Sequence, residues 1–531
     1  MPRVATLLLL IAAACAREEP APDAHRSTAP PSADSNIAAR DYVGPAACGE
    51  CHPDEHARWQ GSLHAAMNAR ADAPGAVIGD FADAHLDYRG GTARFTTEGG
   101  ARYLTTGTTA ADRRVTRYRV TRTIGRRGLQ EYVGIEDGHT DEVRLPFGWW
   151  PKRGGWFPQV YFDPWIGDET KFDAYAPVRE PWAERCPWCH STYPFEQRIA
   201  RSSGPRALGH GLEQYFTSAA GGERLGAQVT TGISCESCHL GGRAHAAGAP
   251  IQFVPIGAAA KPDAPAPTSF AQERTDARVV NTVCAQCHSG PSPRLADGTA
   301  LRNSSEALDL AASECHGARC TQCHDPHQPS QPIAQLEARS IAACESCHPA
   351  QRDATHAGGH TTATCLDCHM PRTVMGIDRF VRTHRISSPS SAAQLAAANA
   401  CNLCHLDRSI AWTTDELRAR WDASPPVIAD DDRGAGETWL AGSASLRLLA
   451  GAAYARTPIA TVRGGALPQL LDGFADPLPY MRAWSLFALE DWLGRSIPPS
   501  ELDPRASPGV RAVQVDAFRR AAFRRKSQSP R

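Results

Sequence analysis

One short pattern recurs along the chain and constrains its fold more than any other feature: two cysteines separated by two residues and followed at once by histidine. The pattern occurs eight times, and every C-x-x-C pair carries the histidine. A zinc ribbon does not require that histidine, and a disulfide framework requires neither the histidine nor the two-residue gap. Covalent haem c requires all three residues, because two thiols add to the porphyrin vinyl groups and the next imidazole binds the iron. The repeat therefore predicts eight covalently attached haem c groups.

The residues of the eight motifs, numbered one to eight in chain order, fall into two sets. The predicted thioether positions are Cys48, Cys51, Cys186, Cys189, Cys235, Cys238, Cys284, Cys287, Cys320, Cys323, Cys344, Cys347, Cys365, Cys368, Cys401 and Cys404. The predicted proximal iron ligands are His52, His190, His239, His288, His324, His348, His369 and His405.

The spacing of the motifs limits how the haems can be housed. All eight lie between Cys48 and His405, which leaves too little polypeptide to give each haem a globular shell of its own. We therefore expect a mainly α-helical and irregular multihaem fold over residues 42–412, in which stacked haems form the core. Covalent attachment and ligation then replace much of the stability that a thin core lacks.

Histidine supplies the second iron ligand in most of the predicted sites. The chain has only five methionines, including Met1, so general His/Met ligation is excluded and most haems should be six-coordinate and low in potential. The favoured distal ligands lie near a motif or near another histidine: His64, His245, His316, His327, His360 and His384. The other candidates are His56, His85, His139, His210 and His356, of which His56 is expected at the solvent.

Two cysteines lie outside the motifs. Cys15 follows Arg3 and an apolar run over residues 4–14, which is typical of an export signal ending in a relaxed lipobox. We expect Cys15 to be lipidated, with ordinary cleavage nearby as the alternative, and residues 16–41, rich in Ala and Pro, to form a disordered tether. Cys315 precedes His316 and is either a buried thiol beside a ligand or a redox-active or iron-binding thiol. The protein is then exported, and periplasmic or associated with the outer membrane.

Two segments without motifs have patterns of their own. Short alternating runs rich in β-branched and aromatic residues, such as residues 114–124, predict a small β-rich insert at about residues 90–165. After the last motif, residues 413–531 predict an α-helical segment, with helices at 437–456 and 478–493. Arg482 and Arg511 follow similar Pro-containing sequences, as at the helix starts of HEAT repeats.

The balance of acidic and basic residues indicates which kinds of molecule the protein can bind. Lys plus Arg is 56 against 57 Asp plus Glu, and this balance argues against nucleic-acid binding. Each oxidised bis-His haem adds about one negative charge, so the loaded protein should be acidic and many arginines should pair with haem propionates. The expected partners are redox donor and acceptor proteins.

The chain resembles the multihaem cytochrome c-552/4 family, and more closely its exported bacterial members that carry helical repeats. The resemblance rests on residues 42–67, 229–245, 316–327, 365–371 and 401–408. It implies that His64, His245, His316 and His384 are distal ligands, and that the activity is largely electron transfer. The helical tail is shorter here than in many relatives.

Three functions remain open from the sequence. The first is an exported electron carrier that relays electrons along closely packed, mostly bis-His haems in a respiratory or extracytoplasmic chain. The second is a multihaem oxidoreductase that acts on a small inorganic nitrogen or sulfur compound at one five-coordinate haem. The third is a structural or filament-forming cytochrome. No C-x-x-C-K motif is present, so the lysine-ligated haem of pentahaem nitrite reductases is not indicated.

Overall fold

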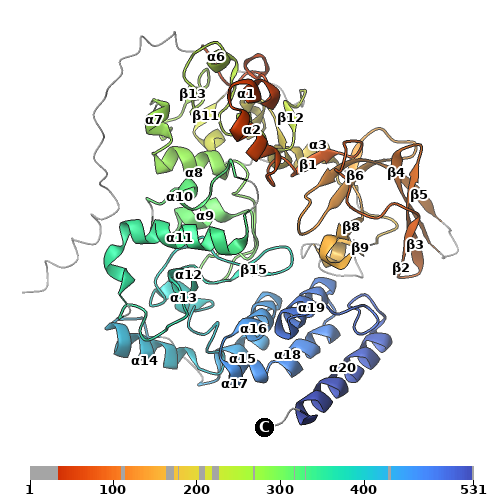
Figure 1. Cartoon of the computed structure of the whole chain (residues 1–531), viewed down its shortest axis with the longest axis vertical. Helices are drawn as coiled ribbons and strands as arrows, with labels where there is room; N and C mark the ends of the chain where they lie inside the picture. The colour runs from red at the N-terminus through yellow and green to blue at the C-terminus, as the bar shows by residue number, and fades with distance from the viewer. Residues whose placement is uncertain are drawn as a thin grey trace, which may run out of the picture.

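The computed structural model describes residues 34–108, 114–162, 173–177, 179–202, 210–217, 226–266, 269–315, 317–328, 331–353, 355–427 and 432–528. Three parts lie side by side in Figure 1: a column of short helices carrying the motifs, a β-sheet beside it, and a helical tail below both. The expected export signal, Cys15, His25 and His316 lie outside the described residues.

Short helices make up the part that carries the motifs, which we call the motif region. They are α1 (Pro45–Cys51), α2 (Pro53–Gln60), α3 (Trp182–Arg185), α4 (Pro187–His190), α5 (Phe195–Ser202), α6 (Arg243–Ala246), α7 (Phe270–Glu273), α8 (Ala277–Ala285), α9 (Glu306–Ala311), α10 (Cys320–Cys323), α11 (Ile333–Cys347), α12 (Cys365–His369), α13 (Ala392–Ala396) and α14 (Ile410–Trp421). Two-stranded pairs brace them: β10 (Ser191–Thr192) with β12 (Thr230–Thr231), β11 (Phe216–Thr217) with β13 (Ala259–Ala260), and β14 (Val374–Met375) with β15 (Phe380–Val381).

The motif region begins before Tyr42 and ends after residue 412. Ile37 is only 4% exposed, and the Asn36 side chain donates a hydrogen bond to the Val254 carbonyl at 3.1 Å. The last residues of the expected tether are therefore ordered, because a buried apolar side chain and a satisfied amide offset the entropy of fixing them. At the other end, Trp421 of α14 donates its indole N–H to the His356 carbonyl at 2.7 Å.

The β-rich insert is a seven-stranded antiparallel sheet that begins earlier in the chain than expected. Its strands are β1 (Asn68–Arg70), β2 (Ala84–Tyr88), β3 (Gly91–Glu98), β4 (Ala101–Thr108), β5 (Val115–Ile124), β6 (Glu131–Glu136) and β7 (Glu142–Arg144). They pair in sequence order from β2 to β7, and β1 pairs with β5. Gly99 and Gly100, both at positive φ, form the tight turn between β3 and β4. A β-bulge in β5 between Val120 and Arg122 shifts the register against β6.

The described residues of the tail form the α-helices α15 (Ala435–Leu440), α16 (Ala444–Arg456), α17 (Ala460–Gly464), α18 (Leu467–Asp472), α19 (Pro479–Leu493) and α20 (Pro508–Gln528). The helix expected at 478–493 is α19. The single helix expected at 437–456 is wrong, because the chain breaks at Gly442 and Ser443 caps α16 by accepting a hydrogen bond from the Leu446 N–H.

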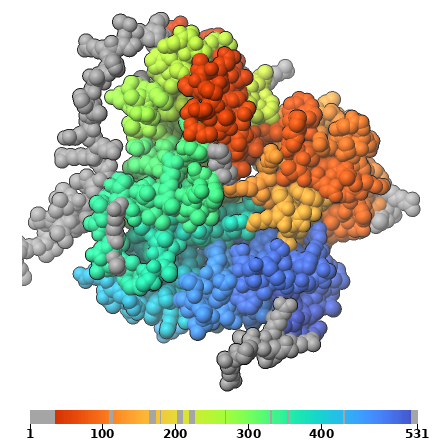
Figure 2. Space-filling view, viewed as in Figure 1, coloured from red at the N-terminus to blue at the C-terminus, as the bar shows by residue number. Residues whose placement is uncertain are grey.

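The tail packs against the sheet side of the molecule through the hairpin of β8 (Phe147–Trp150) and β9 (Gly155–Pro158). The rings of Trp150 and Phe487 lie 4.6 Å apart, and Arg153 forms an ion pair with Glu490 at 2.7 Å. Buried residues of the sheet and of the tail belong to one continuous hydrophobic cluster, and their surfaces adjoin in Figure 2. The aromatic residues of this hairpin therefore form core.

Arg482 and Arg511, the two arginines of the HEAT-like pattern, are both buried at helix starts. Arg482 donates to the carbonyls of Asp476, Pro477 and Pro504, and Arg511 donates to the carbonyl of Phe474. Each guanidinium thus satisfies backbone acceptors that the turns between helices leave open. Within the described residues, no helix is long and apolar enough to cross a membrane.

Candidate haem-binding sites

Most of the described motifs wind into one helical or helix-like turn. The histidine N–H donates to the carbonyl of the first cysteine four residues earlier, as between His52 and Cys48 at 2.9 Å. The same bond is present in the motifs of His239, His288, His324, His348 and His405. One turn places both thiols and the imidazole on neighbouring positions, which is the arrangement that thioether attachment and ligation of one haem require.

Six motif histidines each face a second histidine from outside the motifs. The pairs and their ring-centre distances are His52 with His245 (6.1 Å), His288 with His64 (6.4 Å), His239 with His327 (6.1 Å), His324 with His384 (6.0 Å), His369 with His356 (6.2 Å) and His405 with His360 (6.4 Å).

These distances fit an iron atom between the rings. An imidazole nitrogen binds a transition metal at about 2.0–2.1 Å, and the ring centre lies roughly 1.1 Å behind it, so two ligating rings have centres about 6.3 Å apart. Direct ring stacking would bring the centres closer, as for Phe95 and Trp156 at 3.6 Å. The residues present therefore fit bis-His haem at six motifs.

Burial lowers the pKa of several motif and facing histidines and so favours the neutral imidazole, which is the form that binds metal. Desolvation lowers the pKa of His239 to about 4 and that of His384 to about 4. Burial also lowers the pKa of His64, His190 and His324. His288 differs: a hydrogen bond from its ring to Glu306 raises its pKa to about 9.

Two motif histidines, His190 and His348, face no second histidine among the described residues. The preferred candidate His316 is itself outside the described residues, but its neighbour Cys315 is half-buried and lies close to Cys344 of the sixth motif.

The sequence expectations for the distal histidines divide into three groups. His64, His245, His327, His360 and His384 each face a motif histidine. His356, which was not among the favoured residues, also faces one. His85, His139 and His210 are exposed, and His56 packs on Trp59 at 5.4 Å. The position of His356 four residues before His360 is the sequence signal that could have favoured it as well.

Carbonyl and carboxylate groups orient several of the rings. The Nδ1 atom lies 2.8 Å from the Ala249 carbonyl in His245, 2.9 Å from the Ala357 carbonyl in His360 and 3.0 Å from the Ser387 carbonyl in His369. In His288 the partner is the Glu306 carboxylate, at 3.2 Å. Such contacts fix the tautomer, because Nδ1 keeps its proton and leaves Nε2 for the metal.

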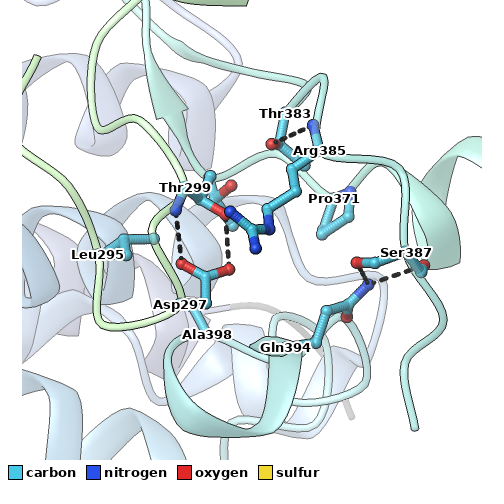
Figure 3. A pocket seen from close by; sticks show the side chains of 10 residues that line it. Leu295, Asp297, Thr299, Pro371, Thr383, Arg385, Ser387, Gln394 and Ala398 are labelled. Atoms are coloured by element: carbon cyan, nitrogen blue, oxygen red, sulfur yellow. Dashed lines mark hydrogen bonds between the residues drawn. The ribbon is translucent and has the colours of Figure 1, made fainter. Parts of the chain in front are cut away.

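Gln394 and Ser387, which line a pocket beside the seventh motif (Figure 3), help to hold the His369 ring. The Gln394 amide donates to the carbonyls of Cys368 at 3.1 Å and Ser387 at 3.2 Å. The Ser387 carbonyl also lies 3.0 Å from Nδ1 of His369. Gln394 therefore links Cys368 of the motif to the carbonyl that orients the His369 ring. On the other side of the pocket, the Asp297 carboxylate accepts hydrogen bonds from the N–H and the hydroxyl of Thr299, two residues further along the chain.

The motifs adjoin one another through their thiols. Cys48 of the first motif lies against Cys235 of the third. In the same way the second motif contacts the fourth through Cys189 and Cys287, and the fourth contacts the fifth through Cys284 and Cys320. Weaker electrostatic contacts join Cys238 to Cys287, Cys344 to Cys323 and Cys365, and Cys368 to Cys404. The motifs therefore form one connected row, from which the second motif branches at the fourth.

The other uses of cysteine find no support in the described residues. None of the described cysteines forms a disulfide. Within the same part of the chain, no three His, Cys, Asp or Glu side chains come together as a metal-ion site. The described structure places paired imidazoles beside the C-x-x-C turns. Haem c accounts for both features, because its vinyl groups bind the two thiols and its iron binds the imidazoles.

Family comparisons agree with this chemistry. A model of the cytochrome c552 family matches residues 351–425, and a model described as a doubled CXXCH motif matches residues 314–353. The protein is therefore a multihaem c-type cytochrome, and its haem is covalently attached. The matched segments overlap at residues 351–353, and the resemblance to the multihaem cytochrome c-552/4 family is confirmed.

Two further comparisons, with solved structures and with curated protein sequences, do not narrow the family any further. The chain is similar to the crystal structure of the outer cell wall cytochrome OcwA, with 15% sequence identity and a TM-score of 0.39, over 85% of this chain and 98% of that chain. No curated protein sequence matches the chain.

Proposed function

We propose that this protein is an exported octahaem cytochrome that transfers electrons along closely packed, mostly bis-His haems in an extracytoplasmic chain. The observation that carries the proposal is the set of six facing imidazole pairs at motifs that adjoin in one row. When bound, each haem supplies a one-electron couple at its iron.

The chain's own residues do three things in this proposal. The motif cysteines would attach each haem at one turn of the chain. The motif histidine and the histidine that faces it would both bind the iron, which would keep the reduction potential low. The contacts between motifs set the spacing of neighbouring haems along the row. For the sixth site we propose His316 as the second ligand, because the sequence places it directly after Cys315, which lies near Cys344.

The proposed partners are redox proteins at either end of the row. Export follows from the haem type, since haem c is attached beyond the cytoplasmic membrane, and lipidated Cys15 would attach the protein to a membrane surface. The mass of the mature N-terminus tests that attachment: an unmodified terminus elsewhere than Cys15 refutes lipidation.

Ligand variants test the haem set most directly. In the His384→Ala variant, we expect one low-spin haem to become high-spin in the electron paramagnetic resonance spectrum, with eight haems retained by mass. The matched control is His139→Ala, which removes an exposed histidine from the sheet side and should leave the spectrum unchanged. An unchanged spectrum in His384→Ala would overturn the bis-His assignment at the fifth motif.

Electron transfer itself is tested by potentiometry and rapid mixing. We expect all eight haems to titrate over a broad, low range of potential, and the reduced protein to be reoxidised completely by a single soluble acceptor protein. A structural cytochrome, by contrast, would leave a fraction of the haems reduced on that timescale. That outcome would contradict the proposal.

A further inference from the structure

The loop between the sixth and seventh motifs carries two of the facing histidines, only four residues apart. His356 faces His369 of the seventh motif with the ring planes at 0°, and His360 faces His405 of the eighth motif with the planes at 73°. One short loop therefore presents a second histidine to two sites, and its conformation decides the geometry of both.

Trp421, at the C-terminal end of α14, contacts both of these histidines. Its indole N–H donates to the His356 carbonyl at 2.7 Å. Its ring is nearly parallel to the His360 ring, with the planes inclined at 17° and the ring centres 6.4 Å apart. The neighbouring Arg420 donates to the carbonyl of Gly358, which lies between the two histidines in the chain, at 3.2 Å. The end of α14 thus holds the loop at three points.

Two glycines of the loop show how closely it approaches the indole. Gly358 and Gly359 both have positive φ, at 59° and 87°, a conformation that favours glycine. A Cβ atom on Gly358 would lie 2.1 Å from Cζ2 of Trp421, whereas one on Gly359 would have Nη1 of Arg420, at 4.0 Å, as its nearest described neighbour. Only a residue without a side chain therefore fits beside the indole at position 358.

The other end of α14 is fixed to the eighth motif. The Thr413 hydroxyl donates to the Asn402 side chain at 2.7 Å, and the Trp412 ring packs on that of His405 with the centres 4.9 Å apart. Trp412 and Trp421 are nine residues apart, or about 13.5 Å along a helix axis. The helix therefore runs from the motif histidine of the eighth site to the histidine that faces it.

We propose that Trp421 is a positioning residue shared by the seventh and eighth haem sites: its N–H fixes the backbone that carries His356, and its ring fixes the plane of His360. This role rests on the bis-His ligation proposed above. Groups that contact a ligating imidazole set its orientation, and the orientation of the two axial rings sets the ligand field of a low-spin iron. The last two haems of the row therefore change together when Trp421 changes.

Electron paramagnetic resonance of the oxidised holoprotein tests the shared role. Parallel axial rings give a rhombic low-spin signal, expected for the seventh haem, and crossed rings give a highly axial one, expected for the eighth. Trp421→Leu should shift both signals. Trp421→Phe keeps a ring beside His360 but removes the N–H, so it should shift the seventh signal alone. If Trp421→Leu leaves either signal in place, the proposal is wrong.

The control on the same helix is Trp412→Leu, which loses a contact with His405 and should shift the eighth signal alone. A shift of the seventh signal in that variant would overturn the proposal, because any disturbance of α14 would then have the same effect. His356→Ala and His360→Ala assign the two signals, since each should convert one haem to high spin. If either variant keeps eight low-spin haems, the ligation is wrong, and this failure is distinct from that of Trp421.

The glycines give a second test, which decides even if Trp421→Leu fails to fold. Gly358→Ala should displace the indole and shift both signals. Gly359→Ala introduces a side chain at positive φ in the same way but without the clash, and should leave the seventh signal unchanged. Equal effects of the two substitutions, or no effect of Gly358→Ala, would overturn the proposal. Haem counting by mass confirms that each variant keeps its full set of haems.

Discussion

Single side chains tune individual sites along the row, and the clearest case is Glu306. Its carboxylate is the only charged group among the described Nδ1 partners within hydrogen-bond distance of a motif histidine. A carboxylate makes the imidazole a stronger donor to the metal and so favours the oxidised state.

Glu306→Gln should therefore raise the midpoint potential of the fourth haem. The exchange of a charged for a neutral hydrogen bond is worth about 1 kcal/mol, or about 40 mV for a one-electron couple. Spectroelectrochemical titration measures the shift. Asp415→Asn, which removes an exposed carboxylate paired with Arg418, is the control for general charge effects. A shift of the same size in both variants would contradict the specific role of Glu306.

Arg198 holds together the contact between the second and fourth motifs. Its Nη2 donates to the Gln286 carbonyl at 2.5 Å and lies 3.8 Å from the buried Glu213 carboxylate. Removing one partner of a buried ion pair costs roughly 3–5 kcal/mol, because the other charge is left without compensation. Arg198→Met should therefore destabilise the holoprotein by that amount in guanidinium unfolding, and Glu213→Gln in the same chain should restore part of the loss.

The pH dependence of that variant follows from Glu213. Burial raises the pKa of this carboxyl, so the folded state binds its proton more readily than the unfolded state does. Protonation then favours folding, and the deficit of Arg198→Met should shrink as pH falls through the raised pKa. A deficit that grows towards lower pH would show that Glu213 is not the uncompensated group.

The residue scale is also where sequence reasoning was strongest. The attachment residues are readable because the chemistry fixes their spacing within one helical turn. The distal histidines are harder to identify from the sequence, because a residue such as His245 meets His52 only through the tertiary fold. His356 was passed over for that reason, although its neighbour His360 was favoured.

At the scale of elements, the contact between the hairpin β8–β9 and helix α19 joins the sheet to the tail. Phe487 is 7% exposed and packs edge-on against Trp150. Phe487→Ala should cost roughly 3–5 kcal/mol through the cavity it leaves. Thermal unfolding followed by near-ultraviolet circular dichroism measures the loss, while the haem absorption should stay unchanged.

The control for this variant is Val513→Ala on α20, where the side chain is 68% exposed and substitution should change stability by less than about 0.5 kcal/mol. Altered haem absorption in Phe487→Ala would mean that the tail also supports the haem sites. The strands and α19 were predictable from local patterns. The docking of the tail on the sheet was not, because no local pattern records which apolar faces meet.

At the scale of the whole molecule, the two kinds of core should separate when haem is withheld. The sheet and the tail share an aromatic cluster that needs no cofactor, whereas the motif region depends on attachment and ligation. In chain expressed without haem attachment, amides of the sheet and of α16 and α19 should remain protected in hydrogen exchange. Those of α8 to α12 should exchange as in an unfolded chain. Equal protection of both parts would contradict this division.

The pairing of early with late histidines has a consequence for how the protein is made. His52 is translated long before His245, and His64 long before His288. In the proposed exported cytochrome, a haem attached at the first motif while the chain leaves the cytoplasm would lack its second histidine until a distant stretch of chain follows. The order in which segments arrive would then be part of how the protein matures.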